Sequence, residues 1–417
     1  MDDLRIDVLV VAVAVLGLAV ASLSARIDRL PLSEPLVATG VGVAVGPQAL
    51  DLLGLPPLDG SGSGAGAQVL GEVAVVLLSL SMMAIVLRYP WPDVRRAARS
   101  AGVLVGVAMP LMALVSAGVA WLVLGPAAGL GAAAALLLGA AVCPTDPVLS
   151  SSVVTGELAE RDVDGRARRL LSLESGANDA LALPLVVVAV AVAGPLAAGD
   201  AAVEVVRGVL GGLALGLAVG YVAARAVRLG ESHGATEPGP VVVFTLVLAV
   251  GVLAAAHLLK VAEVLAVLVA GLALNAGWSG HDRVRGATLD EALNRYAVLP
   301  FFVLLGAALP WSAWAETGWV LVPLVVGVLV LRRLPVLLLL ARPLRLPVRD
   351  AVFLGWFGPI GVSGLYYLLE VAHRVPGSAL VVTTGVAVVA ASTVVHGLTG
   401  SPGRVLYRRF GSTAGVR

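Results

Sequence analysis

The most unusual chemistry in this chain lies in one short polar stretch within a long apolar run. The stretch reads Glu174-Ser175-Gly176-Ala177-Asn178-Asp179, and its surroundings have the composition of a membrane-spanning helix. An ionisable side chain near the centre of a bilayer costs roughly 2.5–3.5 kcal/mol on insertion scales, so such residues usually have a function. Glu174 and Asp179 are therefore candidate site residues.

The spacing within this stretch gathers its polar groups on one broad helix surface. Glu174 and Asn178 are four residues apart, as are Ser175 and Asp179, and residues at that spacing share a face. A carboxylate in an apolar setting has two low-energy states, protonated or neutralised by a bound cation. Proton and cation then compete for one group, which is sufficient for obligatory exchange at a site with alternating access. We expect Asp179 to be this group.

A second acid lies in the preceding apolar run, between Pro144 and Pro147. Proline removes a helical hydrogen bond, and freed backbone groups persist in a membrane only where protein or water satisfies them. A helix break is therefore predicted here, and hard oxygen ligands favour Na⁺ or Li⁺ by analogy with other hard cations. The predicted Na⁺ site comprises Asp146 and Asp179, with Ser175, Thr145 and freed carbonyl groups completing the shell.

A second break is predicted within Gly355-Trp356-Phe357-Gly358-Pro359-Ile360-Gly361, at Gly358 and Pro359. If the chain contains two inverted six-helix repeats, both breaks fall in the fifth helix of a repeat. Interrupted segments at matching positions are typical of the midplane binding site of secondary transporters. The alternative is a pair of ordinary proline kinks.

Two further charges, Arg332 and Arg333, lie inside the apolar run 317–340. An unpaired guanidinium at membrane depth is costly. We predict an ion pair between Glu174 and Arg332 that keeps both groups out of the exchange. The alternative is that the two arginines mark the end of a span.

The composition is that of a polytopic helical membrane protein. Of 417 residues, 59% are hydrophobic and 13% are charged, against about 25% charged in soluble domains. The net charge of +1 argues against a nucleic-acid partner, and the lack of a nucleotide-binding motif argues against coupling to ATP. With the single Cys143 no internal disulfide is possible, and no cofactor is expected. Residues 1–417 are predicted to form one all-α membrane domain.

Apolar runs long enough to span a bilayer recur throughout the chain. Thirteen spans are predicted, at 6–24, 33–50, 68–88, 101–124, 129–154, 168–193, 202–228, 239–257, 260–277, 294–310, 317–340, 348–371 and 377–398. Arginines occur in every second loop, including Arg283, Arg285 and Arg295, and after the last span, whereas the other loops hold only Arg5, Lys260 and Arg374. Because basic residues favour the cytoplasmic side, we expect an external N-terminus and a cytoplasmic C-terminus in a prokaryotic cell membrane.

At these residues the chain resembles the NhaP-type sodium/proton antiporters of the monovalent cation:proton antiporter superfamily. The resemblance rests on Thr145-Asp146-Pro147, on the stretch from Glu174 to Asp179, and on Gly355-Trp356-Phe357-Gly358-Pro359. It implies crossed unwound helices and a homodimer important for pH homeostasis. It also implies a core domain, expected at 68–193 and 317–398, that moves against a dimerisation domain, expected at 1–50 and 202–277. Residues 399–417 would form a short cytoplasmic tail.

The resemblance also assigns roles to the site residues. Cation binding is implied for Asp146, Asp179, Ser175 and Thr145, and structural roles for Asn178, Glu174 and Arg332. An Asn-Asp pair goes with electroneutral one-for-one exchange in this superfamily. The chain departs from many relatives at residues 79–84, where the third span lacks an acid and only Glu72 is near, and at Ile360, where many have arginine.

Other functions remain open at this stage. K⁺/H⁺ exchange or a broad monovalent range would use the same carboxylates. An intramembrane aspartyl protease would need Asp146 and Asp179 to share a proton. A cation channel would carry current without moving protons against cations. Collapse of a proton gradient on adding Na⁺, without peptide cleavage, distinguishes the antiporter.

Overall fold

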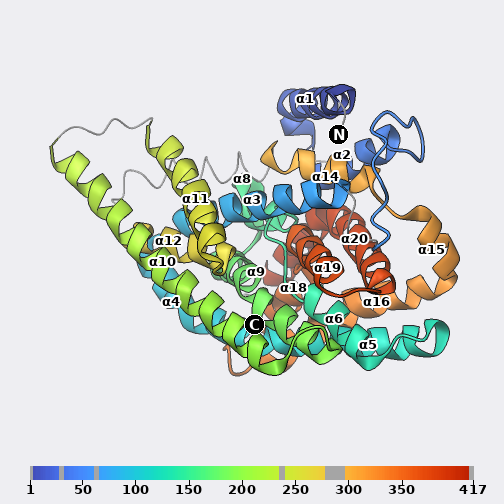
Figure 1. Cartoon of the computed structure of the whole chain (residues 1–417). Helices are drawn as coiled ribbons and strands as arrows, with labels where there is room; N and C mark the ends of the chain where they lie inside the picture. Colours follow the sequence, from blue (N-terminus) through green and yellow to red (C-terminus); the bar gives the residue numbers. More distant parts are fainter. Residues whose placement is uncertain (1–2, 28–31, 61–64, 234–239, 278–295, 413–417) are drawn as a thin grey trace.

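The computed structural model describes residues 3–27, 32–60, 65–233, 240–277 and 296–412, and the regular structure in them is entirely helical. Figure 1 shows α18, α19 and α20 near the middle, with α10–α12 along one side and α5, α15 and α16 along the other. The helices are α1 (Asp3–Ile27), α2 (Glu34–Val45), α3 (Ala65–Arg88), α4 (Trp91–Val103), α5 (Met109–Ala128), α6 (Ala132–Ala141), α7 (Ser151–Val154), α8 (Gly156–Asp162), α9 (Gly165–Ala193), α10 (Ala198–Ser232), α11 (Pro240–Leu259), α12 (Glu263–Ala276), α14 (Leu299–Ala307), α15 (Trp311–Thr317), α16 (Leu321–Leu331), α17 (Leu334–Leu340), α18 (Val348–Trp356), α19 (Val362–Arg374) and α20 (Ala379–Ser412).

Every predicted span overlaps a helix or a pair of half-helices. Within the described ranges, six helical stretches are long and apolar enough to cross a membrane: Gly66–Arg88, Trp91–Ala128, Gly165–Ala193, Ala198–Gly230, Trp311–Leu340 and Ala379–Phe410. The spans predicted at 33–50 and 294–310 correspond to α2 and α14, with 12 and 9 residues, which reach only about 18 and 14 Å. The count of thirteen stays a prediction, and residues 294–295 and the arginines at 283, 285 and 295 lie outside the described residues.

Helices α10 and α12 pack with their backbones almost in contact. A side chain at any of three α10 glycines would collide with the α12 backbone: Gly212, Gly216 and Gly220 face Ala262, Ala266 and Ala270, respectively. Small residues at four-residue spacing allow this close approach, which favours helix association in a membrane. The α10–α12 pair is therefore a tightly packed unit on one side of the molecule.

Both predicted helix breaks are present, and they lie against each other. The chain leaves helical conformation between α6 and α7, over residues 142–150, and between α18 and α19, over residues 357–361. The main-chain N–H of Asp146 donates to the carbonyl oxygen of Pro359 at 2.8 Å, which joins the two unwound segments. The inverted-repeat arrangement itself stays a prediction.

The C-terminal helix is tied to the short helix that follows the first break. Residues 399–412 continue α20 to Ser412, and the short cytoplasmic tail at 399–417 stays a prediction. The Asp162 carboxylate accepts hydrogen bonds from Arg161 and Arg408 at 2.8 Å and from Arg404 at 3.2 Å. Arg404 also donates to the carbonyl oxygen of Ser152 in α7 at 2.9 Å. One buried carboxylate thus connects α8 to the end of α20.

Replacing Asp162 with asparagine should lower stability by about 2 kcal/mol, the range for losing hydrogen bonds to a charged group. The hydrogen bond from Arg161, with the charges of Arg408 and Arg404, holds the pKa of Asp162 below its usual range. The contribution is therefore present above about pH 4 and is lost as pH falls through the lowered pKa. Thermal unfolding of the detergent-purified protein measures the effect.

The matched control is Asp93→Asn, which removes the partner of the exposed Arg96 on α4. Exposed pairs contribute little, so the unfolding midpoint should hardly change. Equal shifts for the two variants would show that Asp162 does not connect α8 to α20 in solution.

Candidate cation site

Asp179 lies near the middle of α9 and is completely buried. Neither carboxylate oxygen of Asp179 has a hydrogen-bond partner among the described residues. The Tyr367 hydroxyl, from α19, donates instead to the main-chain carbonyl oxygen of Asp179. A buried carboxylate without partners is unfavourable unless it is protonated or bound to a cation. Asp179 therefore has the properties expected of an exchanging group.

A compact polar network joins α9 to the first unwound segment. The Asn178 amide donates to the Thr145 hydroxyl at 2.7 Å and to Glu174 at 2.9 Å, and its oxygen accepts from the main-chain N–H of Thr145 at 3.1 Å. The hydroxyls of Thr145 and Ser175 are 3.0 Å apart. All four side chains are buried. Asn178 thus holds the unwound chain so that the Thr145 hydroxyl lies beside that of Ser175, one helical turn before Asp179 on α9.

The predicted partner of Glu174 is wrong by one residue. Arg333, not Arg332, forms the ion pair, with two parallel hydrogen bonds of 2.8 Å to the two carboxylate oxygens. Arg333 also donates to the carbonyl oxygen of Leu354 at 2.7 Å. The alternative of a span end is also wrong, since both arginines lie at a turn between α16 and α17 within the stretch Trp311–Leu340, and both are buried. Pro335, near the start of α17, accounts for the turn.

Arg332 contacts backbone carbonyls instead of a carboxylate. One nitrogen of its guanidinium donates to the carbonyl oxygens of Val142, Cys143 and Pro144 at 2.8–2.9 Å, and another donates to Gly358. These carbonyls follow the C-terminal ends of α6 and α18, where the helix dipole is negative. One buried cation thus neutralises the C-terminal ends of both broken helices.

Asp146 contacts the backbone at the opposite side of each break, where the chain returns to helical conformation. One carboxylate oxygen accepts from the main-chain N–H groups of Val148 at 2.7 Å and Leu149 at 3.1 Å, and the other accepts from Val362, the first residue of α19. A β-carbon at Gly361 would collide with this carboxylate, so the close approach requires glycine. The carboxylate is largely occupied by backbone donors, and direct cation binding by Asp146 stays a prediction.

Near the two unwound segments, every buried charged side chain among the described residues except Asp179 has a partner of opposite charge or backbone hydrogen bonds. Glu174 is paired with Arg333, while Asp146 and Arg332 carry opposite charges on the two sets of helix ends. Among the described residues at this crossing, only Asp179 has neither an opposite charge nor a hydrogen-bond donor on its carboxylate.

Sequence reasoning missed one hydroxyl. Ser363 is in the first turn of α19, is completely buried, and lies beside the Asp179 carboxyl group. Its oxygen makes no hydrogen bond to Asp179 or to any other described residue. An available signal was its place immediately after the second break, in Gly361-Val362-Ser363.

Two broken helices whose unwound segments meet, beside an unpaired buried carboxylate, are typical of a multi-pass membrane transporter. The family described as "Sodium/hydrogen exchanger, transmembrane" matches residues 11–403, and the chain belongs to this family. The similarity to NhaP-type antiporters that the motifs predict is thereby confirmed. Family members are transporters whose ions are substrates, so the protease alternative is excluded and no cofactor is involved.

Related proteins come from yeasts and from an archaeon. The Na(+)/H(+) antiporter 2 of Zygosaccharomyces rouxii is 32% identical over 359 residues, which cover 81% of this chain and 42% of the relative. The Na(+)/H(+) antiporter of Saccharomyces cerevisiae is 29% identical over 362 residues, which cover 81% and 35%. The chain thus spans less than half the length of these relatives, and the prokaryotic origin stays a prediction.

The fold is also that of a solved structure. The sodium proton antiporter MjNhaP1 from Methanocaldococcus jannaschii, solved at pH 8, superimposes with a TM-score of 0.73 over 97% of both chains at 17% identity.

A double-mutant cycle tests the corrected ion pair. Glu174→Gln and Arg333→Gln should each destabilise strongly, because each leaves an uncompensated buried charge, and their coupling energy should be about 2–3 kcal/mol. The same cycle with Arg332→Gln should give a clearly smaller coupling, since Arg332 contacts carbonyl groups. Denaturation in mixed micelles provides the free energies of unfolding, and equal coupling in both cycles would contradict the assignment.

Proposed function

We propose that this protein exchanges Na⁺ or Li⁺ for H⁺ across a membrane, one for one and without net charge movement. The observation that carries the proposal is the Asp179 carboxylate, buried and without a partner. It needs either a proton or a cation, and it holds one of them at a time. A single such group moves one positive charge in each direction per cycle.

The cation ligands in this proposal come from both sides of the crossing. Asp179 supplies the charge, and the hydroxyl oxygens of Ser175 and Thr145, which lie 3.0 Å apart, add neutral ligands. Ser363 supplies a further oxygen from α19. Asp146 contributes its negative charge from the crossing rather than a free oxygen, since backbone N–H groups already contact both of its oxygens.

Alternating access requires the site to open to one side at a time. We propose that residues 68–193 and 317–398, which include both broken helices, form the moving core, and that residues 1–50 and 202–277 form the dimerisation side of a homodimer. The close packing of α10 on α12 supports a rigid dimerisation side. The N-terminus would face outward and the C-terminus the cytoplasm.

The direct test uses proteoliposomes with an imposed pH gradient. Added Na⁺ should collapse the gradient with the unchanged protein, and Asp179→Asn should reduce the collapse to that of protein-free liposomes, because asparagine cannot exchange a proton for a cation. Clamping the membrane potential at different values should leave the initial rate unchanged. The control variant Asp93→Asn, which removes the partner of the exposed Arg96 on α4, should be fully active.

Each alternative has a distinct result in this experiment. A response to K⁺ as well as Na⁺ would keep the mechanism and widen the substrate range. A rate that follows the membrane potential would contradict electroneutral exchange. Cation current without proton movement would indicate a channel, and full activity of Asp179→Asn would remove Asp179 from the cycle.

Ser363→Ala tests the ligand that the sequence did not predict. Losing one uncharged oxygen ligand should raise the apparent KM for Na⁺ about three- to tenfold, the range for about 0.7–1.4 kcal/mol. Thermal stability should be unchanged, because the Ser363 hydroxyl makes no hydrogen bond to another described residue. Ser116→Ala, at another buried hydroxyl without a partner, on α5, is the matched control. Equal KM values for the two variants would contradict a role for Ser363.

A further inference from the structure

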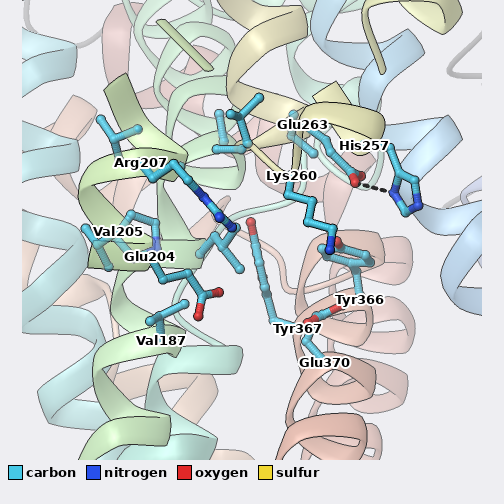
Figure 2. Close-up of a pocket in the computed structure, with 18 of the residues that line it drawn as sticks. Val187, Glu204, Val205, Arg207, His257, Lys260, Glu263, Tyr366, Tyr367 and Glu370 are labelled. Atoms are coloured by element: carbon cyan, nitrogen blue, oxygen red, sulfur yellow. Dashed lines mark hydrogen bonds and ion pairs between the residues drawn. The ribbon is translucent and has the colours of Figure 1, made fainter. Parts of the chain in front are cut away.

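A cavity of about 490 Å³ lies beside the second half of α9, at the end of the bundle opposite α8. Figure 2 shows Glu204 and Arg207 reaching into it from α10, with Tyr366, Tyr367 and Glu370 on the facing wall. Tyr367 lines the cavity and also donates to the carbonyl oxygen of Asp179. One side chain of the cavity wall therefore contacts the residue that carries the proposed exchange.

An ion pair joins the two walls of this cavity. Arg374, the last residue of α19, contacts the Glu204 carboxylate of α10 at 2.7 Å. The same guanidinium contacts Glu370, one turn earlier on its own helix, at 2.8 Å. Arg374 thus makes two similar ion pairs, of which one is within α19 and the other connects α19 to α10.

The other charges around the cavity do not join these two walls. Among the described residues, His257 and Glu263 form a 2.7 Å pair between the end of α11 and the start of α12, on the α10 side.

The Glu204–Arg374 ion pair connects two helices that otherwise pack mainly on different neighbours. α10 packs mainly on α12, while α19 packs on α20, α3 and α6. In the proposed function these helices belong to the two parts that move relative to each other. A contact of 2.7 Å does not survive a relative displacement of several ångströms, so the pair exists only on one side of such a movement.

We propose that the Glu204–Arg374 ion pair is a latch that stabilises the conformation in which this cavity, whose wall includes Tyr367, is open. The proposal rests on the proposed function, in which the core containing α19 moves against the α10–α12 pair. Each cycle breaks the latch when the cavity closes and re-forms it when the cavity opens. Glu370 pairs with Arg374 in both conformations, because it lies on the same helix, and this pair does not connect α19 to α10.

Cysteine labelling tests the latch without depending on transport. Leu183→Cys places a thiol on the cavity wall one turn beyond Asp179, and the only native cysteine, Cys143, is buried. In nanodiscs, a water-soluble maleimide should label this thiol only while the cavity is open. Adding Glu204→Gln should slow labelling about two- to fivefold, the population change that a partly exposed ion pair supports.

Glu370→Gln is the matched control, because it removes the same charge from the same arginine without uncoupling the two helices. Labelling should then proceed at the parent rate, whereas Glu204→Asp, with a shorter reach, should give an intermediate rate. Equal effects of Glu204→Gln and Glu370→Gln, or none from Glu204→Gln, would overturn the latch. Gel filtration and thermal unfolding identify any variant that fails to fold.

The labelling result is separable from the transport result. If Asp179→Asn abolishes exchange but Glu204→Gln leaves labelling unchanged, the antiport proposal stands and the latch fails. If labelling responds as expected in a protein that exchanges no cation for protons, the latch stands as a conformational contact and the proposed function fails.

Discussion

The structure depends on two buried side chains of opposite charge, Asp146 and Arg332, which contact the ends of the two broken helices. Breaking two helices inside a membrane leaves backbone N–H and carbonyl groups without partners, and it places four helix ends close together. Asp146 satisfies N–H groups at the beginning of the continuing helices, and Arg332 satisfies carbonyl groups at the end of the preceding ones. Without this opposed pair the crossing would contain unsatisfied dipoles, and α9 would have no unwound chain beside it.

This arrangement also explains why the neighbouring acids behave differently. Glu174 has a guanidinium on both oxygens, and Asp146 has backbone donors on both, so the oxygens of each carboxylate are occupied by fixed partners. Asp179 has no such partner. The same buried region therefore contains acids committed to structure and one acid left for a mobile ion, and the difference follows from which donors surround each one.

The sequence predicted features that stand out against an apolar background. Prolines beside Asp146 and acids within a membrane helix are rare enough to mark the breaks and Asp179. The partner of Glu174 could not be predicted, because Arg332 and Arg333 are adjacent and point about 100° apart on a helix, and the turn before Pro335 changes both directions. Ser363 was missed because a lone serine in an apolar helix resembles any other small residue. The short lengths of α2 and α14 could not be predicted, because hydropathy depends on composition and does not show where helical hydrogen bonding ends.

The close contact of α10 with α12 has a mechanical consequence. The α10 glycines face backbone atoms of Ala262, Ala266 and Ala270, so little side-chain volume between the two helices can be compressed or change rotamer under load. Such a pair should move as a rigid body, so that a displacement at the Glu204 end is transmitted along both helices instead of being absorbed by local side-chain movement. Elastic deformation would then be concentrated in the connections to α9 and α19, where strain can be converted into displacement of the ion.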